Sequence, residues 1–175
     1  MTKKYKDDYK LCDVTDAKGK IRYGAEYIGK YFKIANDEKE LKSIKISIGV
    51  MYIVMWCLWM FGLMQKGVFA TTWYVVFPYV AGAVPMFMAS DRMIDLLLRK
   101  NPLKRENKDK LSEGFATRIM LQTLFYIVSA VTFIVMLFIN KAIVQDYIFI
   151  AINILLIILS IICGTIQRKL RFIEN

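Results

Sequence analysis

Long uncharged blocks of apolar residues alternate along this chain with short charged intervals. Charge-free stretches occupy Ile46–Met64, about 68–89, 119–139 and Tyr147–Cys163. A helix rises about 1.5 Å per residue, so each stretch comes close to the roughly 30 Å thickness of a bilayer's hydrocarbon core. The pattern predicts an all-α integral membrane protein with four transmembrane helices, arranged as two hairpins.

The interval between the second and third helices, Ser90–Arg118, is the most strongly charged part of the chain. It carries eight Lys or Arg residues and five acids. Positively charged connections are retained in the cytoplasm, and four crossings return a chain to its starting side, so both termini are expected to be cytoplasmic. The expected organisation is an N-terminal cytoplasmic or interfacial segment (1–36), a first transmembrane hairpin (37–89), a basic cytoplasmic loop (90–117), and a second hairpin with a basic tail (118–175).

The N-terminal segment is polar and rich in tyrosine. Leu11–Val14 and Lys20–Tyr23 can pair as a short hairpin around a turn at 16–19. Residues 25–34 allow two interpretations: an interfacial amphipathic helix with tyrosine rings at headgroup depth, or an extended segment packed under the bundle. Either structure contacts the membrane or another protein. The candidate contact residues here are Tyr23, Tyr27, Tyr31 and Phe32.

Two local signals predict where helices begin and bend. Asp37, followed by Glu38 and Glu40, is typical of a helix start, because side-chain oxygens cap free amides and acids favour the first turn. Pro78 and Pro85 interrupt the second span and flank small residues at 81–83, which favours a kink and a close approach of another helix.

The charged central interval predicts a further amphipathic helix, Asp91–Lys100, lying on the inner leaflet or against the bundle. Asn101-Pro102 is expected to end it, because a residue before proline disfavours helical geometry. Lys104–Lys110 is expected to be a solvated basic linker. Candidate membrane-surface or partner contacts in this interval are Arg92, Arg99 and Lys100.

Three polar residues fall inside the last two spans. Gln122, Thr132 and Asn153 are the candidates for hydrogen bonds between helices, because a polar side chain within a bilayer seeks a partner on a facing helix.

Composition and charge narrow the function classes. Hydrophobic residues make up 57% of the chain, above the roughly 45–50% of an ordinary soluble domain. The net charge of +10 lies beside the spans, so an anionic inner leaflet explains it better than nucleic acid does. The chain has no histidine and three isolated cysteines, so we expect no catalytic residues, no cofactor and no metal site.

Asp91 and Asp95 offer an alternative chemistry. Paired carboxylates can hold Mg²⁺ for a phosphorylated lipid, and prenyl-transferring membrane enzymes use aspartates at a similar spacing. Those enzymes have two acid-rich motifs and more helices, whereas here one pair lies among arginines. A lipid-processing enzyme is therefore the least favoured of the functions considered.

The layout favours a non-enzymatic protein of the cell membrane that crosses it several times. We expect an accessory, assembly or regulatory subunit of a larger membrane complex, with a membrane or cytoplasmic protein as its partner. The alternative is a homo-oligomeric transport or pore component, with a path lined by Gln122, Thr132 and Asn153. The spans contain no Asp, Glu, Lys or Arg, the usual coupling groups of proton-driven transport.

Overall fold

The computed structural model describes residues 3–15, 21–67, 72–98, 102–139 and 143–174, and it is mostly helical. Four helical rods are long and apolar enough to cross a membrane, which confirms that the four predicted stretches form helices of the required length. They are α1 (Glu38–Leu63), α2 with α3 (Trp73–Ala81, Ala83–Leu98), α4 with a π-helical turn and α5 (Arg105–Asp109, Lys110–Gly114, Phe115–Ile139), and α6 (Val144–Gln167).

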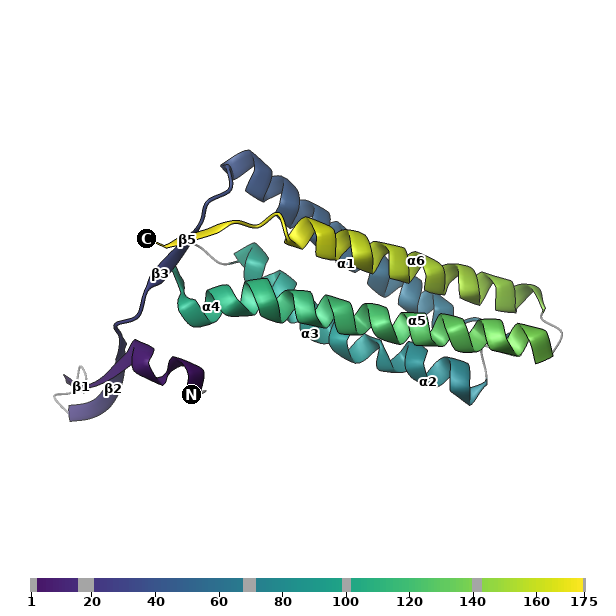
Figure 1. Cartoon of the computed structure of the whole chain (residues 1–175), viewed down its shortest axis with the longest axis horizontal. Coiled ribbons are helices and arrows are strands. Elements are labelled where there is room, and N and C mark those ends of the chain that lie inside the picture. Colours follow the sequence, from purple (N-terminus) through teal and green to yellow (C-terminus); the bar gives the residue numbers. More distant parts are fainter. Residues whose placement is uncertain (1–2, 16–20, 68–71, 99–101, 140–142, 175) are drawn as a thin grey trace.

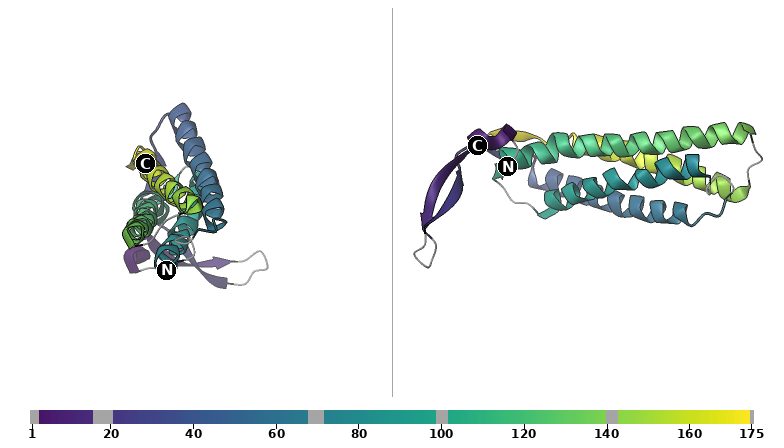
Figure 2. Two further views of the ribbon diagram at one scale, coloured as in Figure 1. Left: turned by 90° about the vertical axis from the view of Figure 1, so that its right-hand side faces the viewer. Right: turned by 90° about the horizontal axis from the view of Figure 1, so that it is seen from below.

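The rods form one antiparallel bundle, in which α5 packs against α6 and against α2–α3, while α1 packs against α6 and α3 (Figure 1). Successive rods run in opposite directions, so each of the four contacting pairs of rods is antiparallel. The view along the bundle shows the four rods gathered around one shared interior (Figure 2, left).

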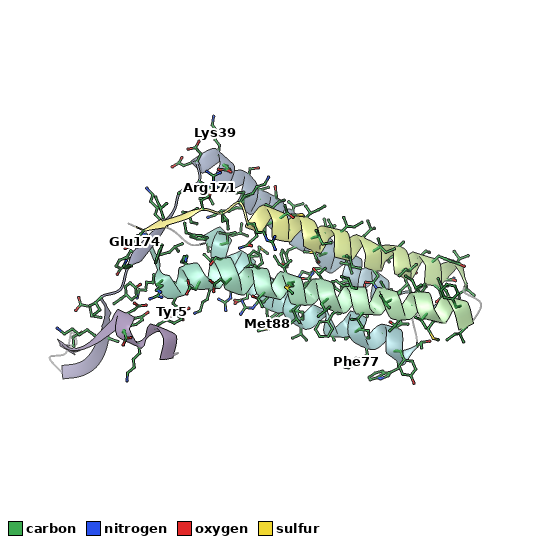
Figure 3. All side chains as sticks on the ribbon, viewed as in Figure 1. Tyr5, Lys39, Phe77, Met88, Arg171 and Glu174 are labelled. Atoms are coloured by element: carbon green, nitrogen blue, oxygen red, sulfur yellow. The ribbon has the colours of Figure 1, made fainter. Side chains whose placement is uncertain are left out.

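Buried positions on the last two rods recur every three or four residues, the spacing that places side chains along one seam of a helix. On α5 the series is Phe115, Ile119, Gln122, Tyr126, Ser129 and Phe133; on α6 it is Asp146, Phe149, Asn153, Leu156, Ser160, Cys163 and Gln167. The opposite faces carry exposed apolar side chains along their length (Figure 3). This apolar exterior is what suits the bundle to a lipid environment.

The second rod is divided at Gly82, between α2 and α3. Pro78 and Pro85 stand on either side of this break, as the predicted kink required. A Cβ atom at position 82 would lie 2.8 Å from Cε1 of Tyr126, whose ring is fully buried. The glycine therefore allows α5 to approach the break closely.

Strands gather at the end of the bundle that carries both chain termini. β3 (Tyr31–Ile34) lies between β4 (Leu103–Lys104) and β5 (Phe172–Glu174), antiparallel to both. We call β3, β4, β5 and α4 the collar. Asn36 strengthens it, because its side chain donates to the Lys169 carbonyl (3.0 Å) and accepts from the Arg171 amide (2.8 Å).

A separate antiparallel hairpin, β1 (Tyr9–Thr15) with β2 (Ile21–Tyr27), follows a 3₁₀ helix at Lys3–Asp8. It projects away from the axis of the bundle (Figure 2, right). The predicted turn at 16–19 lies outside the described residues, and the strands on both sides are longer than expected. The interfacial helix considered for 25–34 is wrong, because β2 and β3 occupy this region and β-favouring aromatic residues outweigh helical periodicity there.

The central interval also differs from its predicted form. No separate helix begins at Asp91; instead α3 continues from within the span to Leu98, because no helix breaker separates the two segments. The expected linker at 104–110 is largely α4, which passes through the π-helical turn into α5. Asp37, by contrast, is the N-cap residue of α1, as its sequence context predicts, but its side chain makes no capping hydrogen bond.

We predict that Gly82→Ala lowers the stability of the detergent-solubilised protein. The new methyl group must displace the buried Tyr126 ring, and such overpacking costs about 1–3 kcal/mol. Gly49→Ala is the matched control, because its Cβ would meet only Leu97 Cδ1 at 3.9 Å, and alanine favours a helix over glycine. Thermal unfolding should separate the two variants, and equal midpoints would contradict the close approach at Gly82.

Candidate functional site

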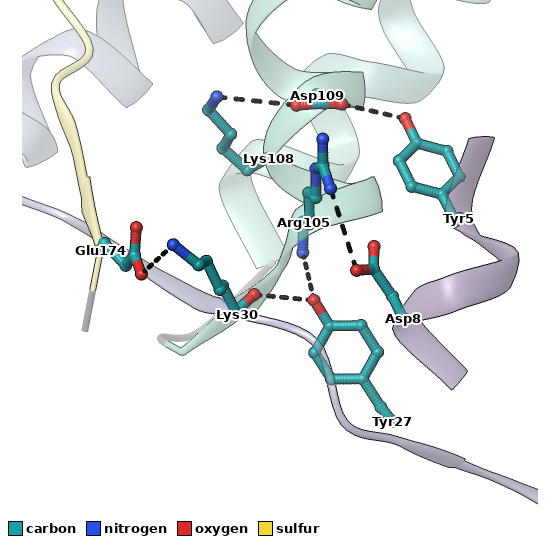
Figure 4. Close-up of polar contacts among 8 residues, drawn as sticks. All are labelled: Tyr5, Asp8, Tyr27, Lys30, Arg105, Lys108, Asp109 and Glu174. Carbon is teal, nitrogen blue, oxygen red and sulfur yellow. Dashed lines mark hydrogen bonds and ion pairs between the residues drawn. The ribbon is translucent and has the colours of Figure 1, made fainter. Parts of the chain in front are cut away.

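The hairpin is joined to the collar through the hydroxyl group of Tyr27. This oxygen accepts a hydrogen bond from the Arg105 amide (3.0 Å) and donates one to the Lys30 carbonyl (2.7 Å), as Figure 4 shows. Desolvation by partial burial raises the pKa of Tyr27 above its ordinary value, so the phenol keeps its proton at neutral pH. One side chain thus connects the end of β2, the start of β3 and the first amide of α4.

Charged side chains surround this junction (Figure 4). Arg105 Nη1 lies 3.9 Å from Asp8 Oδ1, and the Tyr5 hydroxyl donates to Asp109 Oδ2 at 3.1 Å. Lys30 Nζ lies 2.8 Å from Glu174 Oε1. Pairs as exposed as the last contribute little to stability, so they mainly set the orientation of the segments they join.

Asp8, Lys30, Arg105 and Glu174 border a groove of about 520 Å³ between the 3₁₀ helix and the collar. Its charged members are Asp7, Asp8, Lys30, Arg105, Lys108 and Glu174. Acids and cations are equal in number, and several already pair with each other. Across the described parts of the chain, no group of three His, Cys, Asp or Glu side chains is placed to hold a metal ion.

The predicted contact residues fall into different environments. The Tyr31 ring lies edge-on to Tyr27 with 5.0 Å between ring centroids, and Phe32 packs towards the core beneath Lys108 Nζ, 5.2 Å from its ring centre. Tyr23 belongs to β2, but its side chain is outside the described part of the structure. Arg99 and Lys100 are also outside the described residues, and Arg92 lies on α3 at the collar end of the bundle.

The π-helical turn marks where α5 is tied to the end of α6. Gln167 Nε2 donates to the carbonyls of Leu111 (3.0 Å) and Ser112 (3.1 Å). The sequence did not reveal this contact, because Gln167 and Ser112 are 55 residues apart and a glutamine at the end of a span is a common feature.

Further hydrogen bonds join the rods inside the bundle. Gln122 Nε2 donates to Ser160 Oγ at 2.9 Å, linking α5 to α6. Trp59 Nε1 donates to the Tyr79 carbonyl and the Tyr79 hydroxyl donates to the Trp59 carbonyl, at 3.3 and 3.1 Å, so α1 and α2 are joined reciprocally. Of these residues, the sequence had singled out Gln122 as an interhelical contact.

Asn153 and Thr132, the other two predicted interhelical contacts, make no hydrogen bond to another rod among the described residues. Asn153 is fully buried on α6, and neither atom of its amide has a hydrogen-bond partner among the described residues. The Thr132 hydroxyl donates to the Val128 and Ser129 carbonyls of its own helix. Because Gln122 and Asn153 face the interior of a single bundle, they do not face a path between copies of the chain.

Asp91 and Asp95 both lie beside Arg92. Their Oδ2 atoms are 3.5 and 3.2 Å from its guanidinium nitrogens. This geometry favours salt-paired acids at the end of a helix over a metal-binding pair.

No protein-family model, curated protein or solved structure matches this chain.

We predict that Tyr27→Phe loosens the hairpin without unfolding the bundle. The change removes two exposed hydrogen bonds, including the acceptor of the Arg105 amide, and each such bond contributes about 0.5–1.5 kcal/mol. Hydrogen exchange should accelerate at Arg105 and along β2 and stay unchanged in α5. Tyr31→Phe is the control, since the described residues give its hydroxyl no hydrogen bond; similar acceleration in both variants would contradict the role of the Tyr27 hydroxyl.

We predict opposite effects from two polar residues of the α6 seam. Asn153→Leu should raise stability by about 1 kcal/mol or more, because a buried amide without partners is replaced by an apolar group of similar size. Ser160→Ala should lower it by about 1 kcal/mol, because Gln122 Nε2 loses its oxygen acceptor and keeps only the weaker contact with Met55 Sδ at 3.5 Å. Thermal unfolding in detergent measures both changes. A marked loss of stability in Asn153→Leu would show that this amide is paired in the folded protein.

Proposed function

We propose that this protein is a non-enzymatic accessory, assembly or regulatory subunit of a larger membrane complex, and that it binds its partner through the β1–β2 hairpin. The observation that carries the proposal is the hairpin itself. It is a two-stranded sheet, and among the described residues neither outer edge is paired with another strand. A hairpin of this size is marginally stable alone, and an open strand edge is a common site for adding a strand from a partner.

The interior of the bundle favours a subunit that acts by binding a partner over a transport or pore component. Its largest fully buried side chains are the rings of Tyr52, Tyr79, Tyr126, Phe115, Phe133 and Phe149. Close-packed rings fill the space that a conducting path through one chain would need. The homo-oligomeric pore is the weaker of the two hypotheses, because Gln122 and Asn153, two of the three residues expected to line a path between copies, are buried inside this one bundle.

Charge supports an orientation with the collar in the cytoplasm of a cell-membrane protein. The collar end carries the basic side chains Lys39, Lys42, Lys45, Arg92, Arg105, Lys108, Arg118, Arg168 and Arg171, whereas the described residues of the opposite end include the single cation Lys66. Basic residues beside spans favour the cytoplasmic side. The hairpin would then meet a cytoplasmic partner, or the cytoplasmic part of a membrane partner.

We predict that a photo-crosslinker at Ile28 captures a single partner protein that is not another copy of this chain. Ile28 is 60% exposed at the base of the hairpin, where its amide donates to the Asp8 carbonyl at 2.9 Å. The matched control is a crosslinker at Lys39, which is exposed at the same end of the molecule on α1 (Figure 3). Crosslinking in intact membranes, followed by gentle detergent purification, should give an adduct of a single mass from Ile28 but not from Lys39.

The same partner should be recovered in a fixed ratio when the native protein is purified without crosslinking. Adducts between identical chains alone, or the same adducts from both positions, would overturn the proposal.

A further inference from the structure

A cavity of about 270 Å³ lies between α3 and α5 near the collar end of the bundle. Its wall is apolar on one side and charged on the other. The residues that line it are Phe87, Met88, Ser90, Asp91, Arg92, Ile94 and Arg118. Small-molecule pockets usually measure roughly 300–1,000 Å³, so this cavity is sized for a headgroup and leaves the rest of a larger ligand outside.

Two guanidinium groups from different helices meet in this cavity. Arg92 comes from α3 and Arg118 from the first turns of α5, and they are close enough for their charges to interact. Like charges brought together in a partly buried place repel one another. Asp91 lies in the same lining and offsets part of this repulsion, so the two arginines and one aspartate leave an excess of one positive charge for an anion to balance.

Both guanidinium groups hold buried donors that nothing satisfies among the described residues. Arg118 Nη1 and Arg92 Nε are each inaccessible to solvent and lack a hydrogen-bond partner. The contacts of Arg92 Nη1 with Asp95 Oδ2, at 3.2 Å, and of Nη2 with Asp91 Oδ2, at 3.5 Å, orient the group and leave Nε without a partner. Arginine forks of this kind match the oxygen atoms of a phosphate group.

Ser90 does not compete for such an anion. Its hydroxyl accepts from Trp56 Nε1 at 3.0 Å and donates to the Met86 carbonyl at 2.9 Å. The donors available to a ligand are therefore those of the two arginines.

The apolar wall indicates where the rest of the ligand lies. Phe87, Met88 and Ile94 are 68%, 46% and 50% exposed on the outer surface of α3, within a rod long and apolar enough to span a membrane. Figure 3 shows Met88 on this outer edge. Charged donors at the end of a span, beside an open apolar face, coincide with the boundary between headgroups and acyl chains, where basic pockets between helices bind lipid headgroups.

We propose that Arg92 and Arg118 bind the phosphodiester of one anionic phospholipid, whose acyl chains lie along α3 against Phe87 and Met88. This site is independent of the hairpin and of any partner bound there. It is a defined position for one lipid, distinct from the general attraction of basic residues to an anionic leaflet.

Native mass spectrometry of the full chain in detergent, titrated with dioleoyl phosphatidylglycerol, tests the site. Arg118→Gln should weaken the tightest binding step about tenfold, the effect of losing a charge-assisted hydrogen bond. Arg168→Gln is the matched control, because it removes an exposed arginine from the same end of the bundle and leaves the cavity intact. Equal losses in the two variants, or none in either, would overturn the proposal.

Two further probes identify the chemistry that is bound. Dioleoylglycerol, which has the same acyl chains without a phosphodiester, should fail to displace the tightly bound phosphatidylglycerol. Inorganic phosphate in excess should also fail. Displacement by dioleoylglycerol would show that the arginines are not used, and displacement by phosphate would show a site for soluble anions; either result contradicts the lipid assignment.

A measurement with both arginines in place guards against misfolding of Arg118→Gln. The photoreactive residue p-benzoylphenylalanine replaces Phe87 at the cavity, or Phe138, which is 88% exposed at the opposite end of the bundle. In vesicles of equimolar phosphatidylglycerol and phosphatidylcholine, adducts at Phe87 should be enriched in phosphatidylglycerol relative to adducts at Phe138. The same lipid ratio at both positions would overturn the proposal.

Discussion

The packing of tyrosine rings against glycines on neighbouring rods is the constraint on which the bundle depends. A Cβ atom at Gly62 would overlap the Tyr79 hydroxyl, and one at Gly82 would press on the Tyr126 ring. In lipid, apolar helices gain little from hiding apolar surface, so close contact and shared hydrogen bonds must hold them together. The reciprocal pairing of Tyr79 with Trp59 supplies both kinds of contact, because it forms only when the glycine lets α1 and α2 approach.

The polar groups of the interior follow from the same constraint. Once the rings fix the distance between rods, a buried donor must find its acceptor across a defined gap, as Gln122 finds Ser160. The seam extends towards the collar, where Gln167 uses carbonyls of the π-helical turn. Asn153 lies in the same seam, yet its amide has no partner among the described residues, so it adds polarity without adding a link.

Much of this bundle was predictable from sequence, because a long local run of apolar residues indicates each of the four helical rods. The start of α1 at Asp37 and the close approach at Gly82 are equally local signals, and both are present. The collar is different. Whether Phe32 pairs with both Leu103 and Glu174 depends on where α3 and α6 end in space, which no local pattern records. For the same reason, the sequence singled out Arg92 for the membrane surface but left Arg118 unremarked, although the two share a cavity only after α3 packs against α5.

The filled interior determines where a ligand or partner can contact this chain. Tyrosine and phenylalanine rings occupy the centre of the bundle, so a ligand or partner of this chain has to meet it on the outside. Two outer features depart from a uniform apolar surface: the cavity with Arg92 and Arg118, and the hairpin connected through Tyr27. Both lie at the collar end of the molecule (Figure 1). A lipid in the cavity would anchor α3 to α5, whereas a partner strand on the hairpin would act on α4 through the amide of Arg105. Since α4 continues through the π-helical turn into α5, the two contacts would act on the same helical rod.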